Sequence, residues 1–452
     1  MTIEGDARAI GANPWALAPA SPREDAYIST ERYYSPTFFD LEREKLWTST
    51  WLVACRLEDV ANVGDFAEFT IVDQSILVVR ESESKIRALR NACRHRGVQL
   101  ANGNGTFHGC QIVCPFHGWR YDLDGTCSYV YQAAQSFDAV NLERERIRLP
   151  EIASETRWGL VFVNMDPNPE PLEEYLGGIR AALDPLGLED MRFNWWRYTE
   201  IACNWKVALE AFLEGYHIMA THPEVAAYAE GDDFSAYKFG TYELDPAGHG
   251  WNLNETNRPN SDEPWPVKGR SELSWVFECD RAMSVGVDGW ISDWQLAIQE
   301  ELAAIREPDE AMMLEFGERL HAHAAARGFP LRPYTPESSG FAHIFPNTVL
   351  ISAYGHAIIY KFRPHGLDPE RCIFDIWSVS LRAEDTPPPS RPTRTGPVPQ
   401  SEIPFILAQD VSNMERQQRG LRTQGFDHEL ISGRYEPMII NFHQALDRVL
   451  DH

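Results

Sequence analysis

Two short Cys/His pairs constrain this 452-residue chain more than any other feature of its sequence. Cys93 and His95 form a C-x-H pair, and Cys114 and His117 form a C-x-x-H pair further along. Most of the remaining cysteines are scattered, so only this segment concentrates soft metal ligands. Two thiolates and two imidazoles at such close spacing predict a metal centre around which the neighbouring chain must fold.

The order Cys, His, Cys, His distinguishes between two kinds of centre. In a Rieske [2Fe-2S] cluster two histidines replace two cysteines on one iron, so each loop can give one ligand to each iron. A structural zinc site uses the same residue types but normally groups them as C-x₂₋₄-C and H-x₃₋₅-H, which leaves zinc as the less favoured alternative. Cys110 could compete as a ligand, but Cys93 and Cys114 already supply two thiolates, so we expect Cys110 to be a packing residue.

Composition excludes several classes of partner. The chain has 41 basic and 67 acidic side chains, a net charge of −26, which disfavours nucleic acid and anionic membrane surfaces as partners. Hydrophobic residues make up 43% of the chain, as in a globular protein, and eight cysteines are too few for a disulfide scaffold. We find no apolar run long enough to span a membrane and no leader-like start, and we therefore expect a cytoplasmic protein.

Hydrophobic periodicity divides the chain into a β-rich part and a mixed part. Short β-type runs separated by turn residues fill 52–164. Helices are expected within 32–51, 202–224, 292–327 and 404–421, and strands at 341–352, 356–363 and 372–381. The Gly- and Asp-rich segment 225–290 is expected to cover a substrate, and 384–405, with seven prolines, to be a stiff connection.

A second group of possible ligands lies in the helix expected over 202–224. Glu210, Glu214 and His217 have the spacing i, i+4 and i+7, which places them on one face of that helix. His222 falls outside this face, but Pro223 disfavours the helical conformation at His222 and lets the chain turn back. Two histidines and a distant carboxylate would make the facial triad of non-haem Fe(II) oxygenases, although an H-x₄-H pair alone is a weak signal.

Taken together, these motifs resemble the Rieske non-haem iron oxygenases, specifically the large (alpha) subunit of aromatic-ring-hydroxylating dioxygenases and their monooxygenase relatives. The resemblance covers nearly the whole chain. It rests on the two-loop Cys/His motif, G-L-V-F-V-N at 159–164, N-W-K at 204–206 with the downstream Glu and His residues, F-P-N at 345–347 and Q-D-V-S-N-M-E-R-Q-Q-R-G-L at 409–421.

The resemblance implies a role for each matched residue. Cys93, His95, Cys114 and His117 would hold the [2Fe-2S] cluster, and His217, His222 and Asp410 the mononuclear Fe(II). Glu214 would bond a cluster histidine of a neighbouring subunit and couple the two centres. Many ring dioxygenases have Asp there, and some monooxygenases have Glu, so this residue weakens the dioxygenase assignment. Glu210 could support the iron site or lie on the surface.

The resemblance also implies an α+β fold with three parts. An all-β Rieske domain (47–164) would be inserted into a catalytic domain (165–452) in which a curved antiparallel sheet grips a helix, and residues 1–46 would pack on the catalytic domain. Near the iron histidines, candidate pocket residues, which could equally be plain core, are Phe212, Leu213, Ile218 and Met219.

The implied function is that of a terminal oxygenase. Electrons would pass from NAD(P)H through a separate reductase, with or without a ferredoxin, to the cluster and then to Fe(II), where O₂ and a small apolar substrate, expected to be aromatic, meet. The expected reaction is cis-dihydroxylation, and the alternative is monooxygenation or N- or O-demethylation. A homotrimer is expected, with or without a beta subunit. A Rieske electron carrier without oxygenase chemistry is a distant alternative, since a carrier needs no second iron site.

Four arginines near the cluster motif suggest how a partner could be steered. A basic rim on an acidic protein would attract an acidic ferredoxin or reductase, although ordinary solvated arginines remain the alternative. The residues are Arg87, Arg90, Arg94 and Arg96.

Overall fold

The computed structural model describes residues 23–223, 241–253, 280–281, 284, 291–305, 310–332, 340–382 and 393–450. Most of the expected substrate-covering segment 225–290, and residues 384–392 of the proline-rich connection, lie outside the described residues. No described helix is both long and apolar enough to cross a bilayer.

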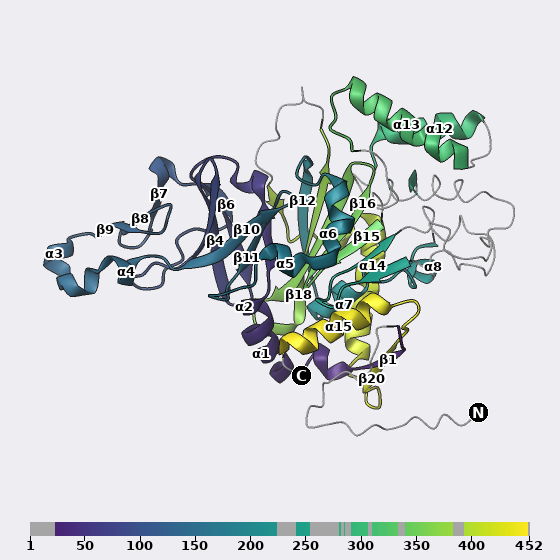
Figure 1. The fold of residues 1–452 in the computed structure, drawn as a ribbon. Coiled ribbons are helices and arrows are strands. Elements are labelled where there is room, and N and C mark those ends of the chain that lie inside the picture. The colour runs from purple at the N-terminus through teal and green to yellow at the C-terminus, as the bar shows by residue number, and fades with distance from the viewer. Residues whose placement is uncertain are drawn as a thin grey trace.

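The expected β-rich part forms two sheets at one end of the molecule (Figure 1). The larger sheet has the order β2-β11-β10-β5-β4-β3-β6, and the smaller has the order β7-β8-β9. Their bounds are β2 Leu52–Arg56, β3 Asp65–Ile71, β4 Gln74–Ser82, β5 Lys85–Arg90, β6 Asn104–Thr106, β7 Gln111–Val113, β8 Arg120–Asp122, β9 Cys127–Tyr129, β10 Glu151–Arg157 and β11 Leu160–Asn164. Two short helices, α3 (Ala133–Ser136) and α4 (Arg144–Ile147), lie beside the smaller sheet (Figure 1).

The second part is built on an eight-stranded sheet with the order β13-β14-β15-β16-β17-β18-β12-β19. Neighbouring strands are antiparallel except for the short parallel pair β12 and β19, so the predicted antiparallel sheet is confirmed with one mixed edge. The bounds are β12 Arg192–Ile201, β13 Thr241–Leu244, β14 Gly250–Leu253, β15 Gly340–Ile344, β16 Thr348–Ala353, β17 His356–His365, β18 Asp368–Ser380 and β19 Arg394–Thr395.

Helices pack against this sheet. α7 packs on β17 and β18 and contacts α14, whereas α15 contacts β13 and β14. The bounds are α5 Leu172–Leu176, α6 Arg180–Leu183, α7 Trp205–Glu210, α8 Ile218–Thr221, α12 Asp293–Ile305, α13 Glu310–Ala326, α14 Phe405–Gly420 and α15 Pro437–Leu450. The helix expected at 404–421 and the strands expected at 356–363 and 372–381 are confirmed. The strand expected at 341–352 is instead two antiparallel strands, β15 and β16, and the segment 292–327 contains two helices, α12 and α13. β12 and α15 were not expected.

β17 shows why the two parts of the fold share one core. Tyr360 and Phe362 pack against Phe212, while Lys361 between them donates to the Ala54 carbonyl of β2 at 3.1 Å. Because successive side chains of a strand point to opposite faces, one face of β17 meets the segment after α7 and the other meets the β-rich part. Burial on both faces explains why this strand is buried almost throughout.

The described N-terminal residues join the end of the chain. β1 (Ala26–Ser29) pairs antiparallel with β20 (His428–Ile431), and α1 (Pro36–Leu41) follows with Ser35 as its N-cap. A π-helical stretch at Glu42–Leu46 and a short helix, α2 (Trp47–Ser49), complete the helix expected within 32–51. The division into 1–46, 47–164 and 165–452 remains a proposal.

The continuous helix expected over 202–224 is wrong. α7 ends at Glu210, residues 211–217 form turns, and α8 begins at Ile218. The carboxylate of Glu214 accepts the backbone N–H of His217 at 3.0 Å, which competes with the helical bond that this amide would otherwise make. Glu210, Glu214 and His217 therefore do not share one helix face. His222 lies outside helical geometry, with φ −117° and ψ 77°, as the proline after it predicts.

Candidate metal centres

The two Cys/His pairs lie in two loops with matching backbone geometry. Cys93 follows β5, and its N–H bonds to the Val98 carbonyl at 2.8 Å; Cys114 follows β7, and its N–H bonds to the Trp119 carbonyl at 2.8 Å. Each loop turns at a glycine with positive φ, 72° at Gly97 and 67° at Gly118, where a side chain would strain the backbone. Two tight loops therefore present the predicted ligands.

The four side chains fit a Rieske cluster. Cys93 and Cys114 are buried, and the rings of His95 and His117 lie next to each other with centroids 4.6 Å apart. Nδ1 of each histidine is buried and has no hydrogen-bond partner among the described residues, although buried ring nitrogens normally have one. An iron ion would satisfy both atoms. Trp119 stacks on His95 at 5.1 Å and limits the movement of its ring.

One further contact to the cluster loop was not predicted. The Tyr121 hydroxyl lies 3.2 Å from Cys93 Sγ and accepts the backbone N–H of Arg94 at 3.0 Å. Tyr121 is fully buried at the centre of β8, the middle strand of the smaller sheet. Sequence offered no signal for this residue beyond its position shortly after the second Cys/His pair.

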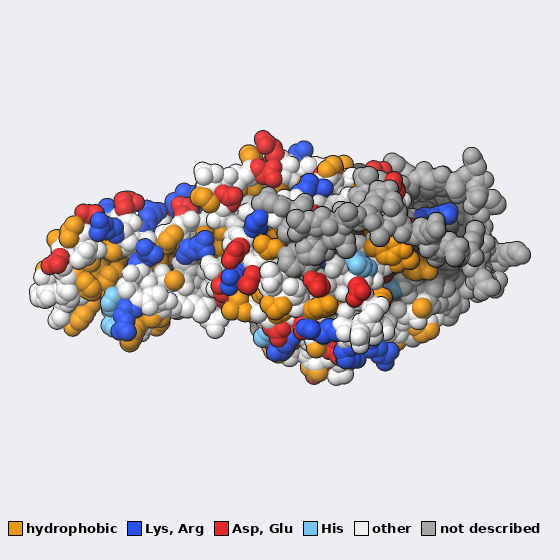
Figure 2. All heavy atoms as spheres, turned by 90° about the horizontal axis from the view of Figure 1, so that it is seen from below, with side chains coloured by type: hydrophobic (Ala, Val, Ile, Leu, Met, Phe, Trp, Pro, Cys, Tyr) orange, Lys and Arg blue, Asp and Glu red, His pale blue; other side chains and the backbone are white. Residues whose placement is uncertain are grey.

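Two sequence-based expectations around the cluster need correction. Arg87 is bound by Glu81 and Glu151, and Arg90 donates to Gln74, so neither is a free cation at the surface. The predicted basic rim therefore reduces to two exposed residues, Arg94 and Arg96. Histidine and Lys/Arg side chains do meet at the surface of this end of the molecule (Figure 2). Cys110 is exposed, with φ 54°, and is not the expected packing residue.

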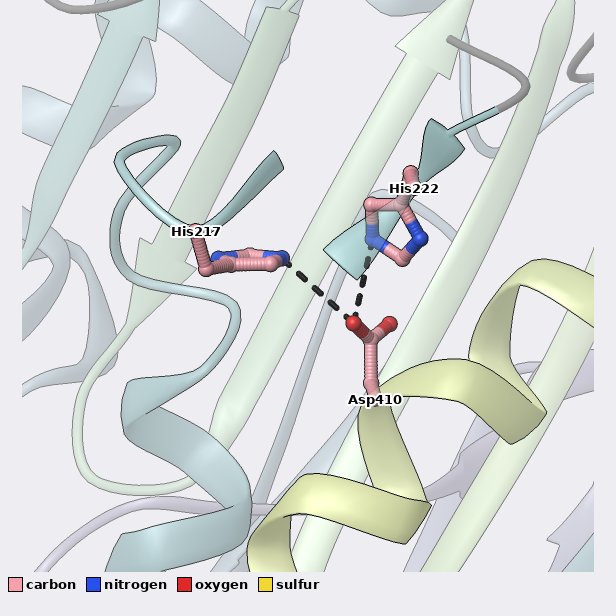
Figure 3. A group of neighbouring side chains, drawn as sticks. All are labelled: His217, His222 and Asp410. Atoms are coloured by element: carbon pink, nitrogen blue, oxygen red, sulfur yellow. Dashed lines mark ion pairs between the residues drawn. The ribbon is translucent and has the colours of Figure 1, made fainter. Parts of the chain in front are cut away.

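The second centre brings together residues that are far apart in the sequence. His217, just before α8, His222, just after it, and Asp410 of α14 offer ligand atoms within 4.8 Å of one another. Nε2 of both histidines faces Asp410 Oδ1, at 3.4 Å from His217 and 3.1 Å from His222 (Figure 3). This arrangement is the two-histidine, one-carboxylate set of a facial triad, which leaves further positions of an iron ion open.

Each iron histidine is held in place through its other nitrogen. His217 Nδ1 bonds to Glu214 Oε1 at 2.6 Å, and His222 Nδ1 bonds to Gln409 Oε1 at 2.8 Å. Since both partners accept, the N–H belongs on Nδ1 and the Nε2 lone pair faces the metal position. Gln409 was not predicted, and its position next to Asp410 was the only available signal.

The electrostatics of the site favour a cation. Burial lowers the pKa of His217, but the carboxylates of Glu214 and Asp410 outweigh it and raise the pKa to about 10. Asp410 is nearly buried, and the two histidines hold its pKa below the usual range despite its desolvation. A divalent metal ion would supply the positive charge that this cluster of acceptors attracts.

A cavity of about 170 Å³ opens beside the triad between α7, α8, α14 and α15. His217 and Asp410 line it, together with Glu210, Glu214 and Glu436. Among the described residues that line it there is no lysine or arginine. Burial raises the pKa of Glu436 to about 7, and the neighbouring Glu214 adds to that effect. The wall of the cavity is therefore rich in carboxyl groups.

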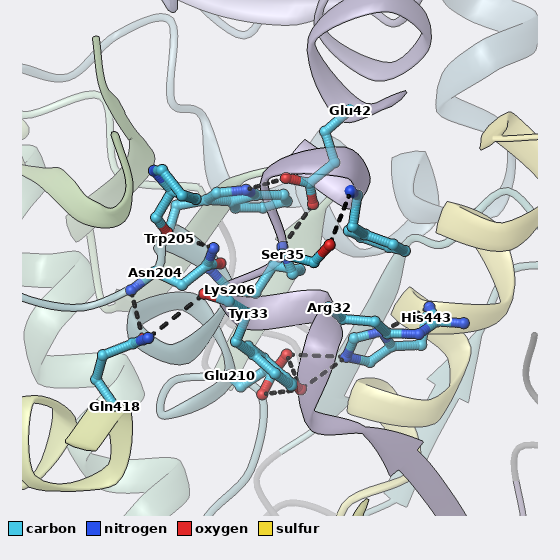
Figure 4. A network of polar contacts seen from close by, with 12 residues as sticks. Arg32, Tyr33, Ser35, Glu42, Asn204, Trp205, Lys206, Glu210, Gln418 and His443 are labelled. Atoms are coloured by element: carbon cyan, nitrogen blue, oxygen red, sulfur yellow. Dashed lines mark hydrogen bonds and ion pairs between the residues drawn. The ribbon is translucent and has the colours of Figure 1, made fainter. Parts of the chain in front are cut away.

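Glu210 is buried, so the alternative that it is a surface residue is excluded. It is 4% exposed, and both carboxylate oxygens lie 3.0 Å from the Tyr33 hydroxyl. His443 Nε2 lies 2.9 Å from Glu210 and 3.2 Å from the Tyr33 hydroxyl, and Arg32 bonds to the other nitrogen of His443 (Figure 4). Burial raises the pKa of Glu210. These contacts hold the Glu210 side chain, which lines the cavity, in place.

The pocket candidates next to the iron histidines are mainly core. Phe212 and Leu213 are buried, and Phe212 packs against Tyr360 at 4.7 Å between ring centroids. Ile218 is partly buried against the same core, and the side chain of Met219 lies outside the described residues.

The sequence matches two protein families in consecutive parts. Residues 50–144 match the Rieske [2Fe-2S] domain, and residues 188–452 match the catalytic domain described as the ring hydroxylating alpha subunit. Among characterised proteins, the carnitine monooxygenase oxygenase subunit of Escherichia coli (strain K12) is 30% identical over 227 residues, which are 50% of this chain and 60% of that protein. The anthranilate 1,2-dioxygenase large subunit of Acinetobacter baylyi is 31% identical over 212 residues, 44% of each chain.

Solved structures show the same fold. A quaternary ammonium Rieske monooxygenase in its apo form has a TM-score of 0.62 at 18% identity and covers 94% of this chain and 96% of its own. Naphthalene 1,2-dioxygenase from a Rhodococcus species, bound to indole, has a TM-score of 0.62 at 18% identity, covering 94% of each chain. In sequence, this chain spans about half the length of the curated relatives that it matches.

Proposed function

Because the chain belongs to the ring-hydroxylating alpha-subunit family with a Rieske [2Fe-2S] domain, we propose that it is the terminal oxygenase of a multicomponent system. The observation that carries this proposal is the convergence of His217, His222 and Asp410, each held by a neighbouring contact. When bound, the two iron centres supply the electrons and the O₂ activation that hydroxylation needs. An electron carrier would need no such triad.

Different residues of the chain have different roles in the proposed reaction. The two Cys/His loops hold the cluster near the surface, where a donor protein can reach it. Glu214 and Gln409 orient the iron histidines, and the half-buried position of His217 beside the cavity leaves that side of the site accessible. Glu214 is also proposed to reach a cluster histidine of a neighbouring copy, which would place the electron path across a subunit boundary.

The first substrate candidate is an apolar aromatic ring that undergoes cis-dihydroxylation. It is supported by two of the relatives, which are dioxygenases. The dioxygenases among the relatives act on ring compounds, as their names state.

The second candidate is monooxygenation at a quaternary ammonium substrate. Its support is the carboxyl-rich cavity beside the triad, whose described lining includes no lysine or arginine and would attract a cation. Glu214, where many ring dioxygenases have Asp, and the names of the carnitine and glycine betaine monooxygenases point the same way.

Oxygen-18 incorporation distinguishes these two reactions. The reconstituted holoenzyme would be incubated under ¹⁸O₂ with aromatic, N-methyl and O-methyl substrates, and products identified by mass spectrometry. Two labelled atoms in a cis-diol support the first candidate, whereas one labelled atom with loss of a methyl or side chain supports the second. If no substrate gives a labelled product and the protein holds two irons per chain, it is an electron carrier and the proposal is wrong.

The partners are also proposed. A ferredoxin or a reductase drawing on NAD(P)H would supply electrons, steered by Arg94 and Arg96 beside the cluster. The proposed assembly is a homotrimer, with or without a beta subunit. Sedimentation of the holoprotein tests the trimer, and reduction of the cluster by candidate donors at low and high salt tests the steering, since screening should slow the reaction.

A further inference from the structure

A second cavity, of about 240 Å³, lies away from the triad at the far end of the large sheet. Its walls come from α12, α13, the turn between β16 and β17, and the ends of β12 and β18. α12 and α13 pack against each other beside the end of the sheet near β16 (Figure 1). This cavity shares no lining residue with the cavity beside the triad.

The cavity is also separated from the triad along the sheet. His356, in its wall, begins β17, and Tyr360 on the same strand packs against Phe212 next to the triad cavity. Four residues of a strand span about 13 Å, so the two sites lie at different positions along β17.

The chemistry of the lining differs from that of the rest of the protein. Although the chain carries a net charge of −26, the described residues that line this cavity include the cation Arg382 and no carboxylate. Arg382 Nη2 donates to the Phe193 carbonyl at 2.9 Å, while its Nε is buried without a hydrogen-bond partner among the described residues. A buried guanidinium N–H normally has an acceptor, so an anion in the cavity would complete the set.

The remaining walls are aromatic. Trp294 lines the cavity and stacks on His323 at 4.4 Å, and Phe329 lies 5.8 Å from Trp294 between ring centroids. Asn194 and Ser380 add polar groups that bond to each other at 2.9 Å. A wall of flat rings and one cation fits a planar ligand with an anionic end.

The turn at the edge of this cavity has a strained backbone. Tyr354 and Gly355 form the two-residue turn between β16 and β17, and both have positive φ, 45° and 84°. Asn or Asp is the usual residue before the glycine in such a turn, and a bulky residue there costs stability. The Tyr354 side chain lies against Phe316 at 5.3 Å, and the residue lines the cavity.

We propose that this cavity is a second small-molecule site, which takes a monocyclic aromatic carboxylate. An apolar cavity of about 150 Å³ already holds benzene, so 240 Å³ has room for a ring and a carboxylate. The carboxylate oxygens would accept from Arg382, and the ring would lie against the aromatic wall that Trp294 and Phe329 form.

Calorimetric titration of the holoprotein with benzoate tests the site, with benzamide as the uncharged probe of the same shape. Arg382→Gln should weaken benzoate binding about tenfold or more and leave benzamide binding nearly unchanged, since it removes only the charge-assisted bond. The matched control is Arg371→Gln, an exposed arginine of β18, the strand that ends just before Arg382, and it pairs with Glu200. It should leave both affinities within about twofold.

Two further variants test the aromatic wall of the cavity and its independence from the triad. Trp294→Ala should weaken both probes, because it removes one wall of the cavity without touching the cation. His222→Ala, which disrupts the triad, should leave the benzoate affinity of this site unchanged. Absence of benzoate binding at millimolar concentration, equal binding by wild type and Arg382→Gln, or loss of all binding in His222→Ala would each overturn the proposal.

Discussion

The hydrogen bond from Tyr121 to the cluster loop leads to a quantitative prediction. Arg94 donates its backbone N–H to the Tyr121 hydroxyl at 3.0 Å, so the hydroxyl oxygen is already used as an acceptor. Its own proton is then free to point at Cys93 Sγ, 3.2 Å away. Donors to cluster sulfurs stabilise the reduced state, which carries more negative charge, and so raise the reduction potential.

The size of the effect follows from the difference between two kinds of hydrogen bond. A bond to a charged group contributes about 1.5–3 kcal/mol and an ordinary one about 0.5–1.5 kcal/mol, so we take about 1 kcal/mol as the extra stabilisation on reduction. For one electron, about 1.4 kcal/mol corresponds to about 59 mV. Tyr121→Phe, which keeps the ring and removes the hydroxyl, should therefore lower the cluster potential by roughly 40–60 mV.

The assay is a redox titration of the cluster followed by its visible circular dichroism or electron paramagnetic resonance signal. Tyr129→Phe is the matched control, because Tyr129 is an exposed tyrosine on the adjacent strand and lies over Arg120. The control potential should not move. A Tyr121→Phe potential within about 10 mV of the wild type, or above it, would refute the reasoning.

Other predictions test each centre and the buried core. Cys93→Ser should abolish the red-brown colour that thiolate-to-iron charge transfer gives, and a colourless wild type with stoichiometric zinc would contradict the cluster assignment. His222→Ala and Asp410→Ala should keep the cluster spectrum but lower iron from about three to two per chain and stop turnover, because two ligands hold Fe(II) poorly; a fully loaded, active Asp410 variant would exclude that carboxylate. Glu214→Gln should keep both metals yet slow reoxidation of the pre-reduced cluster in single-turnover stopped flow with substrate and O₂, whereas wild-type rates would show that no coupling passes through it. Lys206→Met should lower the unfolding free energy by about 3–5 kcal/mol in denaturant titrations, because it leaves a fully buried carboxylate partner unpaired, and a change below about 1 kcal/mol would contradict this.

The features that sequence predicted are those that local spacing encodes. The cluster loops could be predicted because all four ligands lie within residues 93–117, and hydrophobic patterns predicted the runs that form β15 to β18 of the eight-stranded sheet. The position of His222 also followed from local chemistry, since the proline after it disfavours a helix.

The features that sequence could not predict depend on contacts between distant segments. Asp410 was selected by resemblance, because one carboxylate among 67 has no local mark. The Glu214 carboxylate accepts the His217 amide, so the predicted helix does not continue through this segment. Arg87 does not contribute to the predicted basic rim, because Glu81 and Glu151 bind it in the folded state. Each of these outcomes depends on a contact between side chains or segments that lie close together only in the folded protein.

The junction of the two chain ends has a consequence for biosynthesis. Glu210, at the wall of the triad cavity, takes its polar partners from Tyr33 and His443, which are 410 positions apart. A nascent chain can form the cluster loops early, since their contacts are local, but this junction must wait until α15 has left the ribosome. Until then Glu210 lacks its histidine partner, so completion of the iron site depends on a segment that is synthesised long after the cluster loops. Release of a truncated chain would therefore give a protein that is coloured by its cluster but lacks a finished oxygenase site.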